Sequence, residues 1–132
     1  MNQPEKLLQQ YFGHASFRTG QKQAIDAILS GRDVLAVMPT GAGKSVCYQI
    51  SALLLRGVTI VISPLISLMK DQVGTLNQAG IHAAFLNSSL TQGQYHTALK
   101  YAMQGRYKII YVAPERLETE GFINFALNSG VK

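Results

Sequence analysis

Met38-Pro39-Thr40-Gly41-Ala42-Gly43-Lys44-Ser45 is the stretch of the sequence that decides the fold. The apolar segment 33–38 predicts a buried parallel strand, and apolar residues recur at helical spacing from Lys44 onward. A glycine-rich loop between a strand and a helix lets successive backbone N–H groups converge on a phosphate at the positive end of the helix. The stretch therefore predicts a phosphate-binding loop, and we expect the chain to bind a nucleoside triphosphate.

Each part of this loop has a predicted task. The glycines let the backbone wrap tightly, Lys44 brings a positive charge to the β- and γ-phosphates as the catalytic lysine, and the Ser45 hydroxyl is expected to bind Mg²⁺. The predicted nucleotide-binding residues are Thr40, Gly41, Ala42, Gly43, Lys44 and Ser45. Met38 departs from the strict pattern G-x-x-x-x-G-K-[ST], which has glycine at that position. A chance glycine-rich turn is the alternative interpretation, and the strand–loop–helix context argues against it.

Composition and charge narrow the class of protein. The chain has 132 residues, 47% of them hydrophobic and 14% charged, which suits one globular domain with a core. The longest apolar stretch, residues 60–69, is too interrupted to span a membrane, and no secretory signal is evident. The single cysteine, Cys47, cannot form an internal disulfide, and these points together favour a reducing cytoplasm. The net charge of +5 leans toward polyanionic partners, although many basic domains bind none.

Strand and helix patterns alternate along the chain. Strands are predicted at 33–38, 58–62, 82–86 and 107–113. Helices are predicted at 4–12, from the N-cap Thr19 to Ser30, from Lys44 to Gly57, at 65–79, after the capping box Thr91–Gln94, and at 122–127. This alternation is typical of an α/β domain with a mainly parallel sheet.

The polar loops of the chain follow the predicted strands. In a parallel sheet, ligands bind at the carboxyl ends of the strands. The loops at 39–45, 63–67, 87–91 and 114–116 each leave such an end. We therefore expect the chemistry of the protein to lie along one edge of the sheet.

Three further segments, taken with the phosphate loop, resemble the RecQ family of DNA helicases. Gly43-Lys44-Ser45-Val46-Cys47-Tyr48-Gln49 is followed by Ser63-Pro64-Leu65-Ile66-Ser67-Leu68-Met69-Lys70-Asp71-Gln72-Val73 and by Ala113-Pro114-Glu115-Arg116-Leu117, in order and with natural spacing. Upstream, Tyr11-Phe12-Gly13-His14-Ala15-Ser16-Phe17-Arg18-Thr19-Gly20-Gln21 is similar to the adenine-recognition motif of that family. The resemblance runs from about Leu8 to the C-terminus. It also covers Met38, since superfamily 2 helicases often lack the first glycine of the loop.

The resemblance implies a RecA-like P-loop NTPase domain, an α/β fold with a mainly parallel sheet flanked by helices. It also implies an enzyme that uses ATP and Mg²⁺ to unwind DNA from 3′ to 5′ in repair and recombination, with single-stranded or partly duplex DNA as its partner. We expect residues 1–132 to be the N-terminal portion of the first RecA-like domain, truncated before the Walker B strand. Residues 1–31 would form an adenine-motif region and residues 32–132 the phosphate-loop core. The oligomeric state is left open.

Three residues of the upstream motif are implied contacts of the adenine base. Gln21 would read adenine, because its amide offers a donor and an acceptor side by side to the N6–H and N7 edge. Arg18 would stack its flat guanidinium on the base, and His14 stands where the family often has an aromatic residue. Spacing alone would favour a solvated Gln21, a surface Arg18 and a loop-filling His14, and only the resemblance reverses that order.

Six residues are implied contacts to DNA of a sequence-independent kind: Ser63, Ser67, Lys70, Asn87, Ser88 and Arg116. A helix that begins after Ser63-Pro64 would present backbone N–H groups and hydroxyls to phosphates. A solvated surface lysine explains Lys70 about as well, and a salt-bridged helix start explains Arg116.

Two alternatives stay open for the function of this chain. No D-E-x-H or similar Walker B sequence occurs in it, so the isolated chain is expected not to hydrolyse ATP and to be a non-catalytic nucleotide- or DNA-binding fragment. Another P-loop NTPase is the second alternative. A nucleotide kinase, however, predicts glycine in place of Met38 and an arginine-rich lid, and a GTPase needs an N-K-x-D motif, which the chain lacks.

Overall fold

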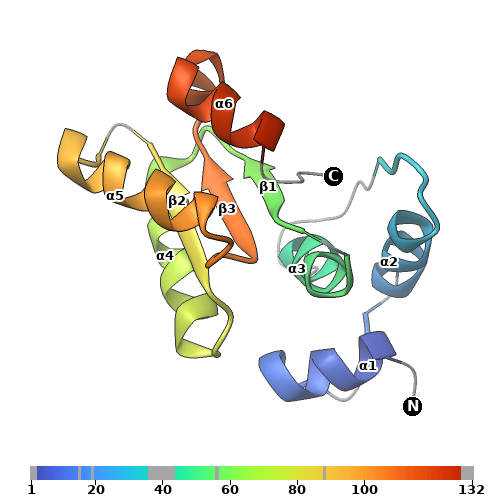
Figure 1. Cartoon of the computed structure of the whole chain (residues 1–132). Coiled ribbons are helices and arrows are strands. Elements are labelled where there is room, and N and C mark those ends of the chain that lie inside the picture. Colours follow the sequence, from blue (N-terminus) through green and yellow to red (C-terminus); the bar gives the residue numbers. More distant parts are fainter. Residues whose placement is uncertain are drawn as a thin grey trace. The chain divides into compact units, whose positions relative to one another are not determined.

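A computed structural model describes residues 3–14, 16–18, 20–35, 44–55, 57–87 and 89–128 of the chain (Figure 1). The chain forms two compact units, residues 1–56 and 57–132, and each is described by itself. The sequence had predicted a boundary between an adenine-motif region at 1–31 and a phosphate-loop core at 32–132. The first unit instead includes both the adenine-motif region and the segment of the phosphate loop.

The first unit is helical in its described part. It contains α1 (Gln3–Leu7), a π-helical turn η1 (Leu8–Phe12), α2 (Gln21–Leu29) and α3 (Lys44–Leu54). Its core consists of three fully buried residues, Leu8, Ile25 and Ile50, one from each of η1, α2 and α3. Partly buried apolar side chains pack around them: Leu7, Phe12, Phe17, Leu29, Val46 and Leu54. The helices predicted at 4–12, before residue 30 and after residue 44 are confirmed.

The start of α2 differs from the prediction. Thr19, the expected N-cap, lies outside the described residues, and the N-cap position is occupied by Gly20 with a φ of 88°. Glycine suits this position because it adopts a left-handed backbone without steric cost. No side chain caps this start; instead, the Gln21 Oε1 accepts a hydrogen bond from the Arg18 N–H at 2.7 Å and ties the preceding turn to the first residue of the helix.

The strand predicted at 33–38 is not formed in its described part. Residues 33–35 are irregular, and Leu35 is 90% exposed. Residues 36–38 lie outside the described residues. An apolar run becomes a strand only when a neighbouring strand accepts its backbone hydrogen bonds, and residues 33–35 pair with none of the described strands.

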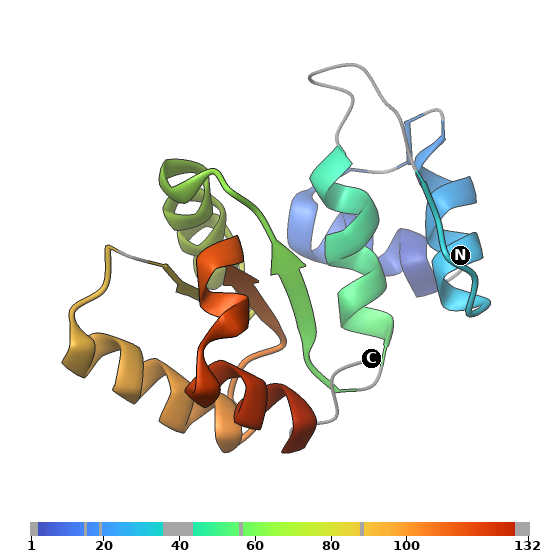
Figure 2. The ribbon, with the colours of Figure 1, turned by 90° about the horizontal axis from the view of Figure 1, so that it is seen from above.

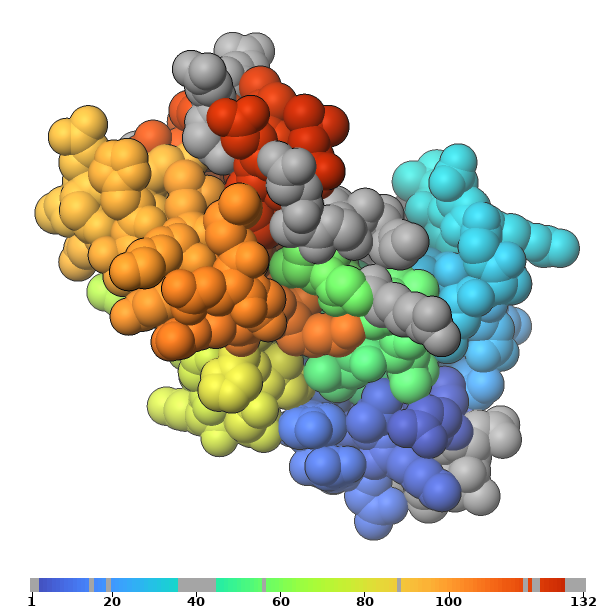
Figure 3. Space-filling model, viewed as in Figure 1, coloured from blue at the N-terminus to red at the C-terminus, as the bar shows by residue number. Residues whose placement is uncertain are grey.

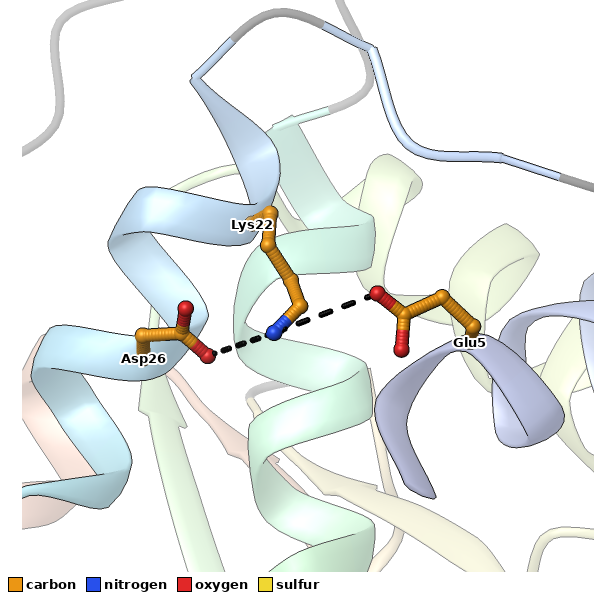
Figure 4. A network of polar contacts seen from close by, with 3 residues as sticks. All are labelled: Glu5, Lys22 and Asp26. Carbon is orange, nitrogen blue, oxygen red and sulfur yellow. Dashed lines mark hydrogen bonds and ion pairs between the residues drawn. The ribbon is translucent and has the colours of Figure 1, made fainter. Parts of the chain in front are cut away.

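A small ionic network connects the first two helices of this unit (Figure 4). The Lys22 ammonium donates a hydrogen bond to the Asp26 carboxylate at 2.9 Å, one helical turn away, and lies 3.9 Å from the Glu5 carboxylate of α1. The hydrogen bond to Asp26 is the main reason that the pKa of Lys22 is raised. Lys22 and Glu5 are partly buried and Asp26 is exposed, so solvent still screens the network, and we expect it to orient α1 and α2 more than to stabilise them.

The second unit is built on a three-stranded parallel sheet. Strands β1 (Thr59–Ile62), β2 (Ala83–Leu86) and β3 (Ile109–Val112) are ordered β1-β3-β2. Thr59 and Ala83 both pair with Ile109, so the three strands start level and end level. All four residues of β3 are buried, as expected for a central strand. The strands predicted at 58–62, 82–86 and 107–113 are confirmed.

Helices cover both faces of this sheet (Figures 1 and 2). Helix α4 (Ile66–Gln78) packs on one face through Met69, Val73 and Leu76, whereas α5 (Gln92–Met103) and α6 (Glu120–Asn128) pack on the other. A short 3₁₀ helix, η2 (Pro114–Glu118), follows β3. The core between the sheet and the last two helices contains Val58, Leu86, Tyr95, Ala102, Ile110, Val112, Phe122 and Phe125. The predicted α/β architecture with a parallel sheet flanked by helices is confirmed.

The start of α5 is fixed by the predicted capping box. The Thr91 hydroxyl accepts a hydrogen bond from the Gln94 N–H at 3.1 Å, and the Gln94 side-chain carbonyl accepts one from the Thr91 N–H at 2.9 Å. Two N–H groups that the helix cannot satisfy internally are thereby paired. This sequence signal predicted the helix start correctly.

Candidate functional site

Helix α3 begins at Lys44, where the phosphate-loop sequence places the start of a helix. Ser45 is half-buried in its first turn. The first turn of a helix carries backbone N–H groups without intrahelical partners and the positive end of the dipole, which together favour an anion. Thr40, Gly41, Ala42 and Gly43 lie outside the described residues, as does the Lys44 side chain, so their contacts to phosphate stay predictions.

The three residues implied in adenine recognition lie before and at the start of α2. Gln21 is 4% exposed and is joined to Arg18 by two hydrogen bonds, in which the Arg18 N–H bonds the Gln21 Oε1 at 2.7 Å and the Gln21 N–H bonds the Arg18 carbonyl at 3.1 Å. The hydrogen bond to its side-chain oxygen holds the Gln21 amide in one orientation. His14 and Arg18 are exposed. A fixed amide beside an exposed guanidinium is chemically suited to a flat base.

The loops that follow the three strands lie along the carboxyl edge of the sheet, because the strands are parallel and end level. A shallow pocket of about 360 Å³ opens at this edge. We call it the edge pocket, and its lining residues are Ile66, Ser67, Lys70, Phe85, Ser89, Leu90 and Gln94. The structure therefore brings together two predicted DNA contacts, Ser67 and Lys70, from the first turns of α4.

The start of α4 leaves backbone donors available at the edge pocket. Its N-cap position is Leu65, whose side chain makes no capping hydrogen bond, and Ser67 and Lys70 are exposed. Ser63 is half-buried and does not line the pocket. Its hydroxyl accepts a hydrogen bond from the Leu65 N–H at 3.2 Å and so shapes the turn into α4. Hydroxyl, ammonium and backbone N–H groups in this arrangement suit phosphate and sugar oxygens.

Asn87 has a different place from the one expected of a residue that touches DNA. Its side chain is fully buried, and its Oδ1 accepts hydrogen bonds from the N–H and the hydroxyl of Ser89, the former at 2.8 Å. Its Nδ2 lies 3.5 Å from the Met69 sulfur. The buried amide therefore folds the loop after β2 and presents Ser89 at the edge pocket. The neighbouring Ser88 lies outside the described residues.

Arg116, a predicted DNA contact, is instead engaged inside the second unit. Its guanidinium lies over the Tyr95 ring at 4.5 Å, and its Nη2 donates to the Asn87 carbonyl at 3.4 Å. Thr119 completes the set, because its hydroxyl lies 3.1 Å from the Tyr95 hydroxyl and donates to the Arg116 carbonyl at 2.7 Å. We call these four residues the Arg116 latch. Among the described side chains, which leave out those of Glu118 and Glu120, no carboxylate pairs with Arg116.

Two polar residues of the edge pocket were not among the predicted sites. Ser89 is the last residue of the polar turn that follows β2, and Gln94 had been assigned to helix capping alone. The capping box places Gln94 at the first turn of α5, and that turn borders the edge pocket. A sequence can signal a cap, but it does not show which pocket the capping residue faces.

A parallel sheet with functional loops at one edge, together with a phosphate-loop sequence leading into a helix, defines an α/β protein of the RecA-like class. The chain belongs to the DEAD/DEAH box helicase family, whose model matches residues 18–128.

Curated relatives support the more specific resemblance to RecQ helicases. The chain is 49% identical over 124 residues to the ATP-dependent DNA helicase RecQ of Bacillus subtilis (strain 168), an alignment that covers 93% of this chain and 21% of that protein. It is 50% identical over 125 residues to the enzyme of the same name from Haemophilus influenzae, covering 95% of the chain and 20% of the relative. The probable ATP-dependent DNA helicase RecS of Bacillus subtilis is 43% identical over 120 residues, with 90% and 24% covered. The chain thus spans about a fifth to a quarter of the length of these relatives.

Two other kinds of site are not found in the described part of the chain. No helix there is long and apolar enough to cross a membrane. No group of three or more histidine, cysteine, aspartate or glutamate residues there is placed to hold a metal ion.

Proposed function

We propose that this chain contributes the ATP-binding part of a RecQ-type DNA helicase that moves from 3′ to 5′ along DNA. The observation that carries the proposal, through its DNA-binding part, is the edge pocket. Ser67, Lys70, Ser89 and Gln94 surround it at the carboxyl edge of a parallel sheet, in a chain matched to a helicase family over residues 18–128. The relatives that are named ATP-dependent DNA helicases support the same conclusion.

ATP is proposed to bind where the phosphate-loop sequence enters α3. Lys44 would contact the β- and γ-phosphates, and the loop residues 40–43 would supply backbone N–H groups. The adenine base would lie against Arg18 and the fixed amide of Gln21, with His14 nearby. The Ser45 hydroxyl in the first turn of α3 is a hard oxygen ligand of the kind that Mg²⁺ prefers. Bound Mg²⁺ would neutralise charge on the phosphates, and the protein would hold the nucleotide in place.

Single-stranded or partly duplex DNA is proposed to cross the edge pocket. Hydroxyls, the Lys70 ammonium and the uncapped N–H groups of α4 recognise phosphate and sugar, which every sequence shares. Ser63 and Asn87 support this surface from beneath, and Arg116 holds the loop of Asn87 through the latch. Their contribution to DNA binding is therefore proposed to be indirect.

Fluorescence anisotropy with labelled single-stranded DNA tests the DNA part of the proposal. Binding should weaken with rising salt and should differ little between sequences. Lys70→Gln removes one phosphate contact and should lower the slope of log Kobs against log salt concentration by about 0.7, the value expected for one phosphate of a single strand. Lys6→Gln is the matched control, because Lys6 is an exposed lysine in α1 and its loss changes the net charge equally. Equal effects of both variants, or tight salt-resistant binding to one chosen sequence, would contradict the proposal.

Calorimetry with ATP tests the nucleotide part. Lys44→Ala should weaken ATP binding by on the order of 1.5–3 kcal/mol, because it removes a charge-assisted hydrogen bond to phosphate. Lys22→Gln serves as a charge-matched control in the same unit, since Lys22 pairs with Asp26 and Glu5. Unchanged ATP affinity in Lys44→Ala, in a protein that binds ATP, would refute the phosphate-loop assignment.

A further inference from the structure

The turn that ends α5 places a cation on an aromatic ring. Gly105 adopts a φ of 73°, its N–H bonds the Ala102 carbonyl at 3.0 Å, and the Arg106 N–H bonds the Tyr101 carbonyl at 3.2 Å. These two hydrogen bonds form a Schellman motif, which brings the residue after the glycine back against the last turn of the helix. The Arg106 guanidinium accordingly lies over the Tyr101 ring at 4.5 Å, although Arg106 itself is exposed. The exposed positive charge is therefore held in a fixed place.

A second pocket lies beside this stacked pair, on the outer side of α5. It measures about 460 Å³ and is lined by Gly93, Gln94, Thr97, Ala98, Tyr101 and Tyr107. We call it the α5 groove. In Figure 3 the orange segment, which includes the end of α5 and the turn after it, forms part of the visible surface of the second unit. Both tyrosines are half-buried, so each ring is anchored in the protein and still has surface to offer.

Two exposed cations lie at the end of α5 and in the turn that follows it. Residues 72–114 contain no aspartate or glutamate, whereas Lys100 and Arg106 are exposed cations at the end of α5 and just after it. Burial, and then the neighbouring Tyr101 phenol, raise the pKa of Tyr107. A surface with a fixed guanidinium, a second cation and aromatic rings suits an anionic partner that also carries flat groups.

The α5 groove and the edge pocket meet at the first turn of α5, because Gln94 lines both of them. We propose that the α5 groove is a second contact for single-stranded nucleic acid and continues the path that begins at the edge pocket. The inference rests on the proposed function, since it extends the same DNA path. Arg106 would contact a phosphate, and the Tyr107 ring would carry a base.

Single-stranded nucleic acid fits this groove better than an acidic peptide. A peptide needs backbone partners or a deep apolar slot, whereas this groove is shallow and offers ring faces beside a fixed guanidinium. Alternating phosphates and bases match such a surface without a particular sequence, because every base has a face that can stack. The α5 groove is also continuous with the edge pocket, which suits one nucleic-acid strand bound across both, whereas a peptide bound in the groove alone would not require this continuity.

The length of the bound oligonucleotide gives the test. Anisotropy is measured with oligothymidylates of about 5 and about 15 nucleotides, near the two ends of the known range of site sizes for single-strand-binding modules. The long oligonucleotide should bind more tightly, and Arg106→Gln or Tyr107→Leu should weaken its binding about fivefold or more. Neither variant should change the affinity for the short one. Arg106→Gln should also lower the salt slope for the long oligonucleotide by about 0.7.

Controls separate this inference from the proposed function. Arg106 is exposed, so Arg106→Gln should keep the far-ultraviolet circular dichroism spectrum even if Tyr107→Leu disturbs the core. If the unmodified protein did not bind the short oligonucleotide, the edge pocket would be refuted as a DNA-binding site. If Arg106→Gln still bound the long oligonucleotide more tightly than the short one by the same factor, the α5 groove would be refuted as a DNA contact, and the edge pocket would be unaffected. The groove would likewise be a protein-binding site if an acidic peptide bound it, Arg106→Gln abolished that binding, and DNA binding were unchanged.

Discussion

Arg116 gives the sharpest test of how the loops of the second unit are held in place. Arg116→Met keeps a stem of similar length and removes the guanidinium that lies 4.5 Å from the Tyr95 ring. A cation over a ring contributes about 0.5–1 kcal/mol at exposed sites and about 2 kcal/mol when desolvated, and Arg116 is half-buried. The hydrogen bond to the Asn87 carbonyl is long, at 3.4 Å, and adds little. We therefore expect the Arg116–Tyr95 pair to contribute about 1 kcal/mol.

The single variant does not isolate that value. The Arg116 Nε is buried and has no hydrogen-bond partner among the described residues. Removing it relieves a desolvation cost of about 1–3 kcal/mol, which can hide the lost stacking. A double-mutant cycle with Arg116→Met and Tyr95→Leu cancels this cost, because the cost is the same in both backgrounds.

The cycle is measured by urea unfolding, followed by far-ultraviolet circular dichroism. The expected coupling energy between the two substitutions is about 0.5–1 kcal/mol, and the upper limit is about 2 kcal/mol. Arg106→Met is the matched control, because Arg106 stacks on Tyr101 at the same distance of 4.5 Å and should show no coupling to Tyr95→Leu. A coupling below about 0.3 kcal/mol for Arg116→Met, the level at which independent sites add, would refute the latch.

Three further predictions concern single residues. Thr91→Ala should lower the free energy of unfolding by about 1 kcal/mol, since it removes the hydroxyl that caps α5. Thr97→Ala, at an exposed position of the same helix, is the control, and an equal loss of stability in both variants would count against the capping box. Burial raises the pKa of the Cys47 thiol, so iodoacetamide should modify it more slowly in the folded protein than in urea at the same pH. Because the folded pKa lies above the unfolded one, Cys47 should also make stability fall as pH rises above about 8.5. Gln21→Ala should erode a preference for ATP over GTP in a competition titration, and full discrimination in the variant would place the adenine site elsewhere.

The sequence predicted the parts of the fold that local patterns encode. The apolar runs of β1, β2 and β3, the helical period of α4 and the capping box of α5 all lie within short windows. Residues 33–35 were mispredicted because a strand also needs a partner, and the partner is not encoded in the run itself. Lys44 and Ser45 were placed correctly at the start of α3, because glycine-rich loops of this kind lead into helices.

The candidate site was predicted less completely, for a related reason. A polar residue after a strand can either face solvent or fold the loop, and its neighbours decide which. Asn87 folds the loop because Ser89 supplies two donors and Met69 covers the amide. An asparagine followed by two serines was an available signal for such a turn. The stacking of Arg116 on Tyr95 could not be predicted from the sequence, because the two residues belong to different elements that only the folded unit brings together.

The strand order β1-β3-β2 also has a consequence for how the second unit is made. Among the described strands, β1 and β2 do not pair with each other, and each pairs with β3, which is the last of the three in the sequence. On the ribosome, the pairing of either strand with β3 therefore cannot form until residues 109–112 have been synthesised and released from the tunnel. Until then the apolar side chains of Ile60 and Leu86 stay uncovered, and the unpaired edges can join strands of other nascent chains. The late arrival of β3 thus sets how long the nascent chain depends on protection from aggregation.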